Sequence, residues 1–270
     1  MTKKILITGA TDGIGLETAK RLYSEGHTLL LHGRNAEKLA TTERTLANGT
    51  GAGLIYTYKA DLSRLSEVDS LANVIAKEHD QLDVIINNAG VMRVTETITQ
   101  DGLDVRFAVN TVAPYLLTKR LLPLMRPASR LVNLSSAAQA PVELDALGGK
   151  KRLLEDMQAY AQSKLALTMW NNALAASYGN EGPVFVAVNP GSLLASKMVK
   201  EGFGIAGKSL SIGADVLVRA ALSEEFAGAS GLYFDNDKGQ FGPPHPDALN
   251  GAKCASIVAG IEELVGRSKP

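Results

Sequence analysis

Residues 4–15 read KILITGATDGIG, and this stretch decides the fold. Residues 4–8 form a short β-branched apolar run, the pattern of a strand buried on both faces. In residues 16–23 the apolar side chains fall on one helical face, and Gly26 is placed to end that helix. The glycines between them lie where a strand turns into a helix. Backbone N–H groups and the positive end of the helix can hold a pyrophosphate there, with no Cβ in the way.

A glycine triplet by itself is also typical of a tight turn, but its place after a buried strand favours dinucleotide binding. The residues expected to contact the dinucleotide in this loop are Gly9, Asp12, Gly13, Ile14 and Gly15. The second strand ends at Gly33, where NAD-binding proteins normally carry an acidic residue for the adenosine ribose. Arg34 comes next, and a guanidinium suits a 2′-phosphate, although a solvated loop arginine is the alternative. The sequence therefore predicts NADP(H) rather than NAD(H).

The composition excludes several classes of function. Hydrophobic residues make up 45% of the 270 and charged residues 21%, as is usual for a globular domain. Because 28 basic residues balance 28 acidic ones, no overall field would attract nucleic acid or anionic lipid. Cys254 is the only cysteine, which excludes an internal disulfide and fits a reducing compartment. The first apolar run stops at Gly9, too early for a secretory signal, and no stretch reaches the roughly 18 apolar residues of a membrane span. We expect a cytoplasmic protein.

Apolar runs of strand length alternate with helical patterns along the whole chain. Strands are predicted at residues 4–8, 28–32, 54–58, 83–86, 130–134, 184–188 and 231–234. The alternation predicts an α/β fold: one domain, residues 1–270, with a doubly wound parallel sheet of seven strands and helices on both faces. The four histidines share no ligand-like spacing. Residues 235–239 resemble a calcium loop but lack its later acidic ligands, so no metal site is predicted.

Polar and small residues follow several of these strands. Asp61 comes after the third strand, where it could accept a bond from an adenine amino group or cap the next helix. Residues 135–136 are serines after the fifth strand, either helix caps or substrate-facing hydroxyls. Asn110 precedes Pro114 in a helical stretch of residues 101–125, where weakened helical hydrogen bonding frees its amide for local work. The fourth strand ends in small and amide residues that suit close approach of a ligand at a topological switch point: Asn87, Asn88, Ala89 and Gly90.

Tyr160 and Lys164 are four residues apart in a predicted helix that ends near Tyr178, so their side chains share one face. An isolated tyrosine has a pKa near 10. An ammonium about 5 Å away, at an effective dielectric of about 20, would favour the phenolate by ~3 kcal/mol, or about two pKa units. Such a phenol is a usable proton donor and acceptor near neutral pH. Taken alone, the spacing also fits a chance pair on an ordinary helix.

Two irregular segments interrupt the alternation. Residues 140–157 contain a proline, two adjacent glycines and a Lys-Lys-Arg run, and we interpret them as an inserted loop with a short amphipathic helix. The basic run, residues 150–152, is expected to be a solvated face. Residues 192–211 are rich in Gly, Ser and Lys and have no clear period. Because they follow the carboxyl end of a strand, we expect them to form a lid over the substrate.

Together these features resemble the short-chain dehydrogenase/reductase family over nearly the full length of the chain. The motifs that carry the resemblance are Thr8-Gly9-x-x-x-Gly13-x-Gly15, Asp61-Leu62, Asn87-Asn88-Ala89-Gly90, Asn110, Ser136, Tyr160-x-x-x-Lys164 and Asn189-Pro190-Gly191. Each motif is weak alone, whereas their occurrence in this order is specific. The glycine spacing is that of the family's non-extended branch, and the resemblance implies a Rossmann fold.

The resemblance also implies a role for four side chains. Tyr160 would be the general acid in carbonyl reduction and the base in alcohol oxidation. Ser136, rather than Ser135, would hydrogen-bond the substrate oxygen, because the family's serine is the second of the pair. Lys164 would lower the Tyr160 pKa and hold the nicotinamide ribose, and Asn110 would position a water in the proton relay. Further residues expected to contact the cofactor are Asp61, Leu62, Asn88, Ala89, Gly90, Tyr160, Lys164, Pro190, Gly191 and Ser196.

Three features depart from the usual pattern of the family. Twenty-four positions separate Ser136 from Tyr160, more than usual, as in retinol-dehydrogenase-like and carbonyl-reductase-like members. The insertion lies beside the helix that normally packs between subunits, so we expect a monomer or a dimer. Asp12 stands where many NADP-specific members have a basic residue, and its charge would oppose a 2′-phosphate that Arg34 attracts. Ser196 stands one position after the place of the family's usual threonine.

The sequence thus predicts an NADP(H)-dependent oxidoreductase that interconverts an alcohol and a ketone or aldehyde. Apolar side chains near the expected lid indicate a small or medium, partly apolar substrate: Leu193, Leu194, Met198 and Phe203. The alternatives are a non-catalytic NADP(H)-binding sensor on the same fold and a family member that catalyses dehydration or epimerisation. Intact Ser136, Tyr160 and Lys164 argue against the sensor, and the glycine spacing argues against the dehydratase or epimerase.

Overall fold

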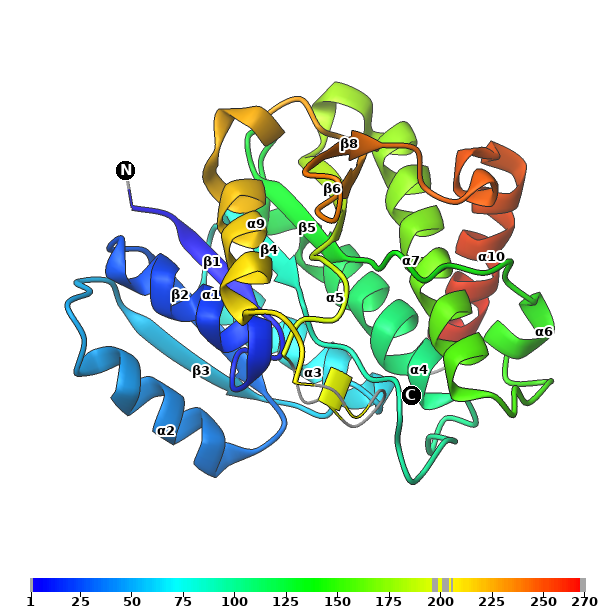
Figure 1. Ribbon diagram of the computed structural model, residues 1–270, viewed down its shortest axis with the longest axis horizontal. Coiled ribbons are helices and arrows are strands. Elements are labelled where there is room, and N and C mark those ends of the chain that lie inside the picture. Colours follow the sequence, from blue (N-terminus) through cyan, green and yellow to red (C-terminus); the bar gives the residue numbers. More distant parts are fainter. Residues whose placement is uncertain (1, 196–198, 201–203, 205, 268–270) are drawn as a thin grey trace.

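Figure 1 shows the computed structural model, which describes residues 2–195, 199–200, 204 and 206–267. Within these residues one sheet has the strand order β3-β2-β1-β4-β5-β6-β7-β8. The strands are β1 (Lys4–Ile7), β2 (Thr28–Gly33), β3 (Ile55–Lys59), β4 (Val84–Asn87), β5 (Arg130–Leu134), β6 (Val184–Asn189), β7 (Tyr233–Asp235) and β8 (Gln240–Gly242). Strands β1 to β7 are parallel, as predicted, and β8 pairs antiparallel with β7.

The sheet in the described residues has eight strands, one more than predicted. The extra strand, β8, is three residues long and has one apolar side chain, Phe241, so no periodic pattern marks it. Phe241 packs against Phe226 and Phe234, with ring centroids 5.0 Å apart in both pairs. Strand β8 is therefore held beside β7, at the end of the strand order, by aromatic packing between distant residues rather than by a local sequence pattern.

Helices cover both faces of the sheet (Figure 1). They are α1 (Gly13–Ser24), α2 (Ala36–Ala47), α3 (Leu65–Glu78), α4 (Val105–Phe107), α5 (Ala113–Leu121), α6 (Leu144–Leu147), α7 (Asp156–Tyr178), α9 (Leu210–Leu222) and α10 (Gly251–Arg267). Helices α1, α2 and α9 pack on one face and α3, α5 and α7 on the other. Helix α10 packs against α7 on the side away from the sheet.

Strand β1 shows why the pattern of residues 4–8 predicts a doubly covered sheet. Ile5 and Ile7 belong to the core cluster with α1, α2 and α9, whereas Leu6 belongs to the cluster with α3, α5 and α7. All three side chains are fully buried. Because alternate side chains point to opposite faces, burial of consecutive residues requires helices on both sides.

The strand order reverses beside β1, which lies between β2 and β4. The chain leaves β1 toward one side of the sheet and later returns to β4 on the other. The carboxyl ends of β1 and β4 therefore border a crevice at a topological switch point, where ligands of open α/β sheets bind. The glycine loop after β1 and residues 88–90 after β4 meet there.

The predicted helix over residues 101–125 is not continuous. A π-helical segment, Ala108–Val112, separates α4 from α5, and a 3₁₀ turn, Leu122–Leu124, follows α5. Pro114 lies at the start of α5, where its missing N–H removes a helical hydrogen bond. Single π-helical turns occur frequently at functional sites, and this one carries Asn110.

Candidate active site

The glycine loop forms the tight strand-to-helix turn that its sequence predicts. Gly9 and Gly13 have φ values of +66° and +55°, which favour glycine. A Cβ on Gly15 would lie 2.3 Å from the Gly9 carbonyl oxygen and 2.4 Å from Asn88 Nδ2. Asp12 caps α1 by accepting a bond from the Gly13 amide at 2.8 Å. A side chain at Gly15 therefore has no room, and the residues of this cradle fit a pyrophosphate at the start of α1.

Asn88 and Thr8 hold this loop against the end of β4. Asn88 Nδ2 donates to the carbonyls of Thr8 at 2.8 Å and Gly9 at 3.1 Å. In return, Thr8 Oγ1 accepts from the amides of Asn88 at 3.0 Å and Ala89 at 3.1 Å. The predicted residues at the ends of β1 and β4 are thus brought together. Thr8 is a positioning residue that the sequence marked only as part of a motif.

His32 is a second residue whose place the sequence did not reveal. Its Nδ1 accepts a bond from the Gly9 amide at 3.3 Å, and its Nε2 lies 3.0 Å from the Ala60 carbonyl oxygen. The ring is 3% exposed, and burial lowers its pKa to about 4. The neutral ring therefore joins the glycine loop to the end of β3. A lone histidine in an apolar strand gives no local signal of such a bridge.

The part of the predicted cofactor site that would hold the adenosine carries several charged side chains. Asp12 lies 3.6 Å from Lys38 Nζ, so its carboxylate has a cationic neighbour that the sequence analysis missed. Arg34 is exposed beyond β2. Burial acts to raise the pKa of Asp61, but bonds from Ser63 and the charge of Arg34 outweigh it and lower that pKa overall.

Asp61 accepts bonds from Ser63 N at 2.9 Å and Ser63 Oγ at 2.7 Å, which forms a turn just before α3. Of the two roles left open for Asp61, the local turn is thus present, although the N-cap of α3 is Arg64. Leu62 is buried in the core between the sheet and helices α3, α5 and α7. Ile14 packs against the core between the sheet and helices α1, α2 and α9.

Ser136, Tyr160 and Lys164 meet beyond the carboxyl end of β5. The Ser136 side chain lies close enough to Tyr160 for hydrogen bonding to lower the Tyr160 pKa. Lys164 Nζ lies 5.7 Å from the centre of the Tyr160 ring, on the same face of α7, and donates to the Leu134 carbonyl at 2.7 Å. Ser135 points elsewhere, since its hydroxyl lies 2.7 Å from Thr168 Oγ1. The second serine of the pair is therefore the one beside the tyrosine.

The pKa values around this group differ from the sequence expectation. Lys164, together with a bound nicotinamide ring, is expected to lower the Tyr160 pKa. Instead, burial raises the pKa of Tyr160, and the hydrogen bond from Ser136 lowers it by less. Burial also lowers the pKa of Lys164 to about 8. The low-dielectric surroundings disfavour both charged forms, a desolvation cost that the simple Coulomb argument left out.

Asn110 makes three hydrogen bonds with its side-chain amide. Its Oδ1 accepts from the Val91 amide at 2.8 Å, and its Nδ2 donates to the Val91 carbonyl at 2.9 Å and to Ser163 Oγ at 3.0 Å. Thr111 Oγ1 donates to the Ser163 carbonyl at 2.8 Å. The π-helical segment is thereby joined to α7 between Tyr160 and Lys164. Ser163 is fully buried, and the sequence analysis did not single it out.

Residues 190–192 follow Asn189, the last residue of β6, at the carboxyl ends of the strands. Gly191 has a φ of +113°, and its amide donates to Asn189 Oδ1 at 3.2 Å. The Pro190 carbonyl accepts from Asn236 Nδ2 at 2.9 Å. The calcium-like run supplies acceptors here, because Asp237 accepts from Ser192 N at 2.8 Å and from Asn189 Nδ2 at 2.9 Å. Ser196, Met198 and Phe203 lie outside the described residues, as does part of the expected lid.

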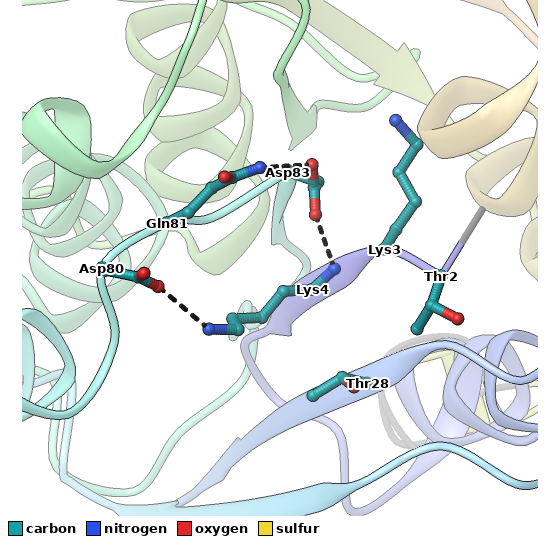
Figure 2. A pocket seen from close by; sticks show the side chains of 7 residues that line it. All are labelled: Thr2, Lys3, Lys4, Thr28, Asp80, Gln81 and Asp83. Carbon is teal, nitrogen blue, oxygen red and sulfur yellow. Dashed lines mark hydrogen bonds and ion pairs between the residues drawn. The ribbon is translucent and has the colours of Figure 1, made fainter.

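A hollow of about 270 Å³ lies at the opposite edge of the sheet (Figure 2). It is lined by Thr2, Lys3, Lys4, Thr28, Asp80, Gln81 and Asp83. These residues precede or begin the parallel strands β1, β2 and β4, so the hollow opens at their amino ends. Asp83 accepts from the Lys4 amide at 2.8 Å, and Asp80 pairs with Lys4 Nζ at 3.5 Å. This hollow is separate from the residues grouped at the carboxyl edge.

Two further features of the described ranges concern metal ligands and membrane spans. No group of three or more His, Cys, Asp or Glu side chains there could hold a metal ion. In the same ranges, no helix combines the length and the apolar character that crossing a membrane requires. The residues at the carboxyl edge thus offer a glycine cradle, a serine–tyrosine hydrogen bond and a buried lysine as their chemistry.

The sequence profile of the short chain dehydrogenase family matches residues 3–204. The chain belongs to this family of oxidoreductases, as its glycine cradle and Ser136, Tyr160 and Lys164 indicate. It is similar to retinol dehydrogenase 13 of Homo sapiens, with 31% identity, and the match covers 99% of this chain and 86% of the relative.

Solved structures share the fold. An uncharacterised protein from Mycobacterium paratuberculosis superposes with a TM-score of 0.81 at 26% identity, over 98% of this chain and 93% of that one. A short chain dehydrogenase from Shigella flexneri complexed with NADP superposes with a TM-score of 0.68 at 26% identity, over 87% of this chain and 96% of that one.

Proposed function

We propose that the protein is an NADP(H)-dependent oxidoreductase that interconverts an alcohol and a ketone or aldehyde. The observation that carries the proposal is the grouping of three side chains: Lys164 Nζ lies 5.7 Å from the centre of the Tyr160 ring, and Ser136 is close enough to act on the Tyr160 pKa. These side chains border the switch point at which the glycine cradle lies. When bound, the nicotinamide cofactor would supply or accept the hydride, and the glycine cradle and Lys164 would hold its pyrophosphate and ribose.

The remaining chemistry belongs to side chains of this protein. Because burial raises its pKa, the Tyr160 phenol is protonated at neutral pH and can donate that proton to a carbonyl oxygen during reduction. In the reverse direction the phenolate takes the alcohol proton. Ser136 would donate its single hydroxyl proton to the substrate oxygen, and its closeness to Tyr160 would bring both hydroxyls to the same oxygen atom. Asn110 would position the water that takes part in the proton relay.

The first test is a screen of NADPH oxidation over aldehydes and ketones of graded size, with wild type and Tyr160→Phe. We expect the variant to bind NADPH with unchanged affinity and to lose at least about 10³-fold in kcat, because only the phenol proton is removed. NADPH fluorescence measures the binding and absorbance measures the turnover. Wild-type binding without turnover of any substrate would favour the sensor instead. A changed substrate without net loss of NADPH would indicate dehydration or epimerisation.

The preference for NADP(H) is argued from the charges at the adenosine end. Arg34 is an exposed cation beyond β2 whose charge also acts on Asp61, and Lys38 offsets the charge of Asp12 that would repel a 2′-phosphate. The Shigella flexneri relative complexed with NADP supports the same choice. We expect Arg34→Asp to raise the KM for NADPH about tenfold or more and to lower that for NADH. An unchanged ratio of the two KM values would contradict the assignment.

The substrate proposed is a small or medium, partly apolar alcohol or carbonyl compound. Leu193 is exposed and Leu194 is buried at the start of the expected lid, residues 192–211. The similarity to a retinol dehydrogenase is consistent with an apolar substrate. We propose that one domain, residues 1–270, carries both the cofactor site and catalysis, and that residues 140–157 are an insertion in it. The single cysteine supports a cytoplasmic location.

A further inference from the structure

Tyr233, at the start of β7, reaches across the sheet edge to the turn that carries Ser136. Its hydroxyl donates to the Ser136 carbonyl at 3.0 Å. Strand β6 lies between β5, which precedes Ser136, and β7. The Tyr233 side chain is 5% exposed, so this bond is shielded from water. A strand far along the sequence thus fixes the peptide group of a proposed active-site residue.

The same carbonyl has a second donor, and the turn has an internal bond. Gln139 Nε2 donates to the Ser136 carbonyl at 2.9 Å, and Gln139 lies close enough to the Tyr233 hydroxyl to lower the Tyr233 pKa. The Ala138 amide donates to Ser136 Oγ at 3.1 Å. Both the peptide plane and the hydroxyl of Ser136 are therefore constrained, and the hydroxyl is directed to Tyr160.

Tyr233 is suited to be a permanent donor. Burial, and then the nearby charge of Asp235, raises its pKa, so the phenol stays protonated across the working range of pH. The titratable groups that face it are Tyr160 on α7 and the carboxylates of Asp235 and Asp237 on its own hairpin. Lys164 Nζ lies 5.7 Å from the centre of the Tyr160 ring. Phenylalanine at position 233 would remove one hydroxyl and leave the ring packing in place.

We propose that Tyr233 is a positioning residue for catalysis, which holds the Ser136 turn so that the Ser136 hydroxyl remains hydrogen-bonded to Tyr160. The inference rests on the proposed roles of Ser136 and Tyr160. Tyr233 itself does not contact the reacting atoms in this scheme. Its loss would let the Ser136 peptide rotate, and a small misplacement of a catalytic group lowers the rate strongly.

The experiment compares Tyr233→Phe with Tyr115→Phe as a matched control. Tyr115 is also buried, and its hydroxyl bonds Glu262 at the outer helix α10, far from Ser136 in the fold. Each variant loses one buried hydroxyl, so a general loss of stability should be similar in both. The measurements are kcat, the Kd for NADPH, the pH profile of alcohol oxidation, and hydrogen exchange of residues 136–139.

We expect Tyr233→Phe to lower kcat about tenfold with an unchanged Kd for NADPH. The kinetic pKa of alcohol oxidation should rise by about half a unit or more, because the Ser136 bond lowers the Tyr160 pKa and is weakened. The amide of Ala138 should exchange faster. Gln139→Met removes the other donor to the same carbonyl and should act in the same direction, which keeps the test available if Tyr233→Phe folds poorly.

The possible failures are distinguishable. A kcat and a pH profile like those of Tyr115→Phe would overturn the role of Tyr233 and leave the proposed function standing. Absence of turnover in wild type would contradict the proposed function instead. In that case hydrogen exchange decides the positioning role: unchanged exchange of residues 136–139 in Tyr233→Phe overturns it, and faster exchange supports it.

Discussion

Proximity of Tyr160 to Lys164 favours the charged form of each side chain, whereas burial disfavours it, so the two effects shift their pKa values in opposite directions. The ammonium lies 5.7 Å from the phenol ring, close to the spacing that the helix predicts. Lys164 is buried and Tyr160 is half-buried, and the loss of solvation raises the pKa of Tyr160 and lowers that of Lys164 to about 8. The protein alone therefore keeps the phenol protonated. Any further acidity must come from what binds beside it.

The lowered pKa of His32 makes the free energy of unfolding depend on pH. Its pKa is lowered to about 4 in the folded protein, against a usual value near 6.5. Between these values the unfolded chain binds a proton that the folded protein does not, so stability falls as the pH drops below about 6.5. From pH 7 to pH 5 the loss due to His32 should be about 2 kcal/mol of unfolding free energy, measured by urea denaturation.

The control for this prediction is His32→Asn, whose side chain can still accept from the Gly9 amide but does not titrate. It should lose about 2 kcal/mol less than wild type over the same pH interval, although it is less stable at pH 7. The buried His27 and His79 also have lowered pKa values, and they contribute equally to both proteins. Parallel pH curves for the two proteins would show that His32 is not buried in its neutral form.

At the scale of single elements, the strand–loop–helix unit at the N-terminus packs tightly around its glycines. Asp12 caps α1, Gly9 and Gly13 adopt positive φ, and Gly15 lies against the Gly9 carbonyl. Backbone N–H groups at the start of the helix are left facing the crevice. Any residue other than glycine at position 15 would push this loop away from Asn88.

Gly15→Ala should therefore impair cofactor binding strongly. Alanine is the better helix former by about 1 kcal/mol, but the added Cβ would lie 2.3 Å from a backbone oxygen, and such overpacking costs about 1–3 kcal/mol. We expect a Kd for NADPH at least about tenfold higher, measured by fluorescence. Gly228→Ala is the control, because a Cβ there meets no atom within 4 Å. Equal affinities of the two variants would contradict the cradle geometry.

The π-helical segment Ala108–Val112 illustrates an element that sequence periodicity cannot foresee. Pro114 correctly indicated weakened helical hydrogen bonding, but a proline does not specify which irregular form results. That form is fixed by tertiary bonds from Asn110 and Thr111 to Val91 and Ser163. These partners lie in other elements, so no local pattern contains them.

At the scale of the whole molecule, helix α10 covers a surface of α7 that could otherwise pack against a second copy of the chain. Its apolar side chains Cys254, Ile257, Ile261 and Leu264 are buried in the same core cluster as α7. Asn172 of α7 donates to the Ala248 carbonyl at 3.0 Å, just before α10 begins. Within the insertion, α6 also packs against α10. The side of α7 away from the sheet is thus covered by the chain's own C-terminal helix.

Because this apolar surface is already covered, we expect the purified protein to be a monomer, or at most a dimer through another face. Association would otherwise have to displace α10, and exposing its buried side chains would cost about 1.5–3 kcal/mol each. Multi-angle light scattering measures the mass directly over a range of concentrations. A tetramer would contradict the prediction and show that another surface provides two interfaces.

The sequence by itself determined the parallel sheet, the glycine cradle, the position of β1 between two layers and the shared face of Tyr160 and Lys164. These features follow from spacing along the chain: a period of two in strands, a spacing of four in helices and glycines at a fixed turn. Short-range geometry repeats the same way in any protein, so local residues suffice to predict it.

Only the tertiary structure decided the eighth strand, the π-helical segment, the bonds made by His32 and Tyr233, and the direction of the pKa shifts at Tyr160 and Lys164. Each depends on partners far away in the sequence or on how much water the packed chain excludes. Desolvation and long-range hydrogen bonds are properties of the assembled fold, because the same residues in an extended chain would be fully solvated and unpaired.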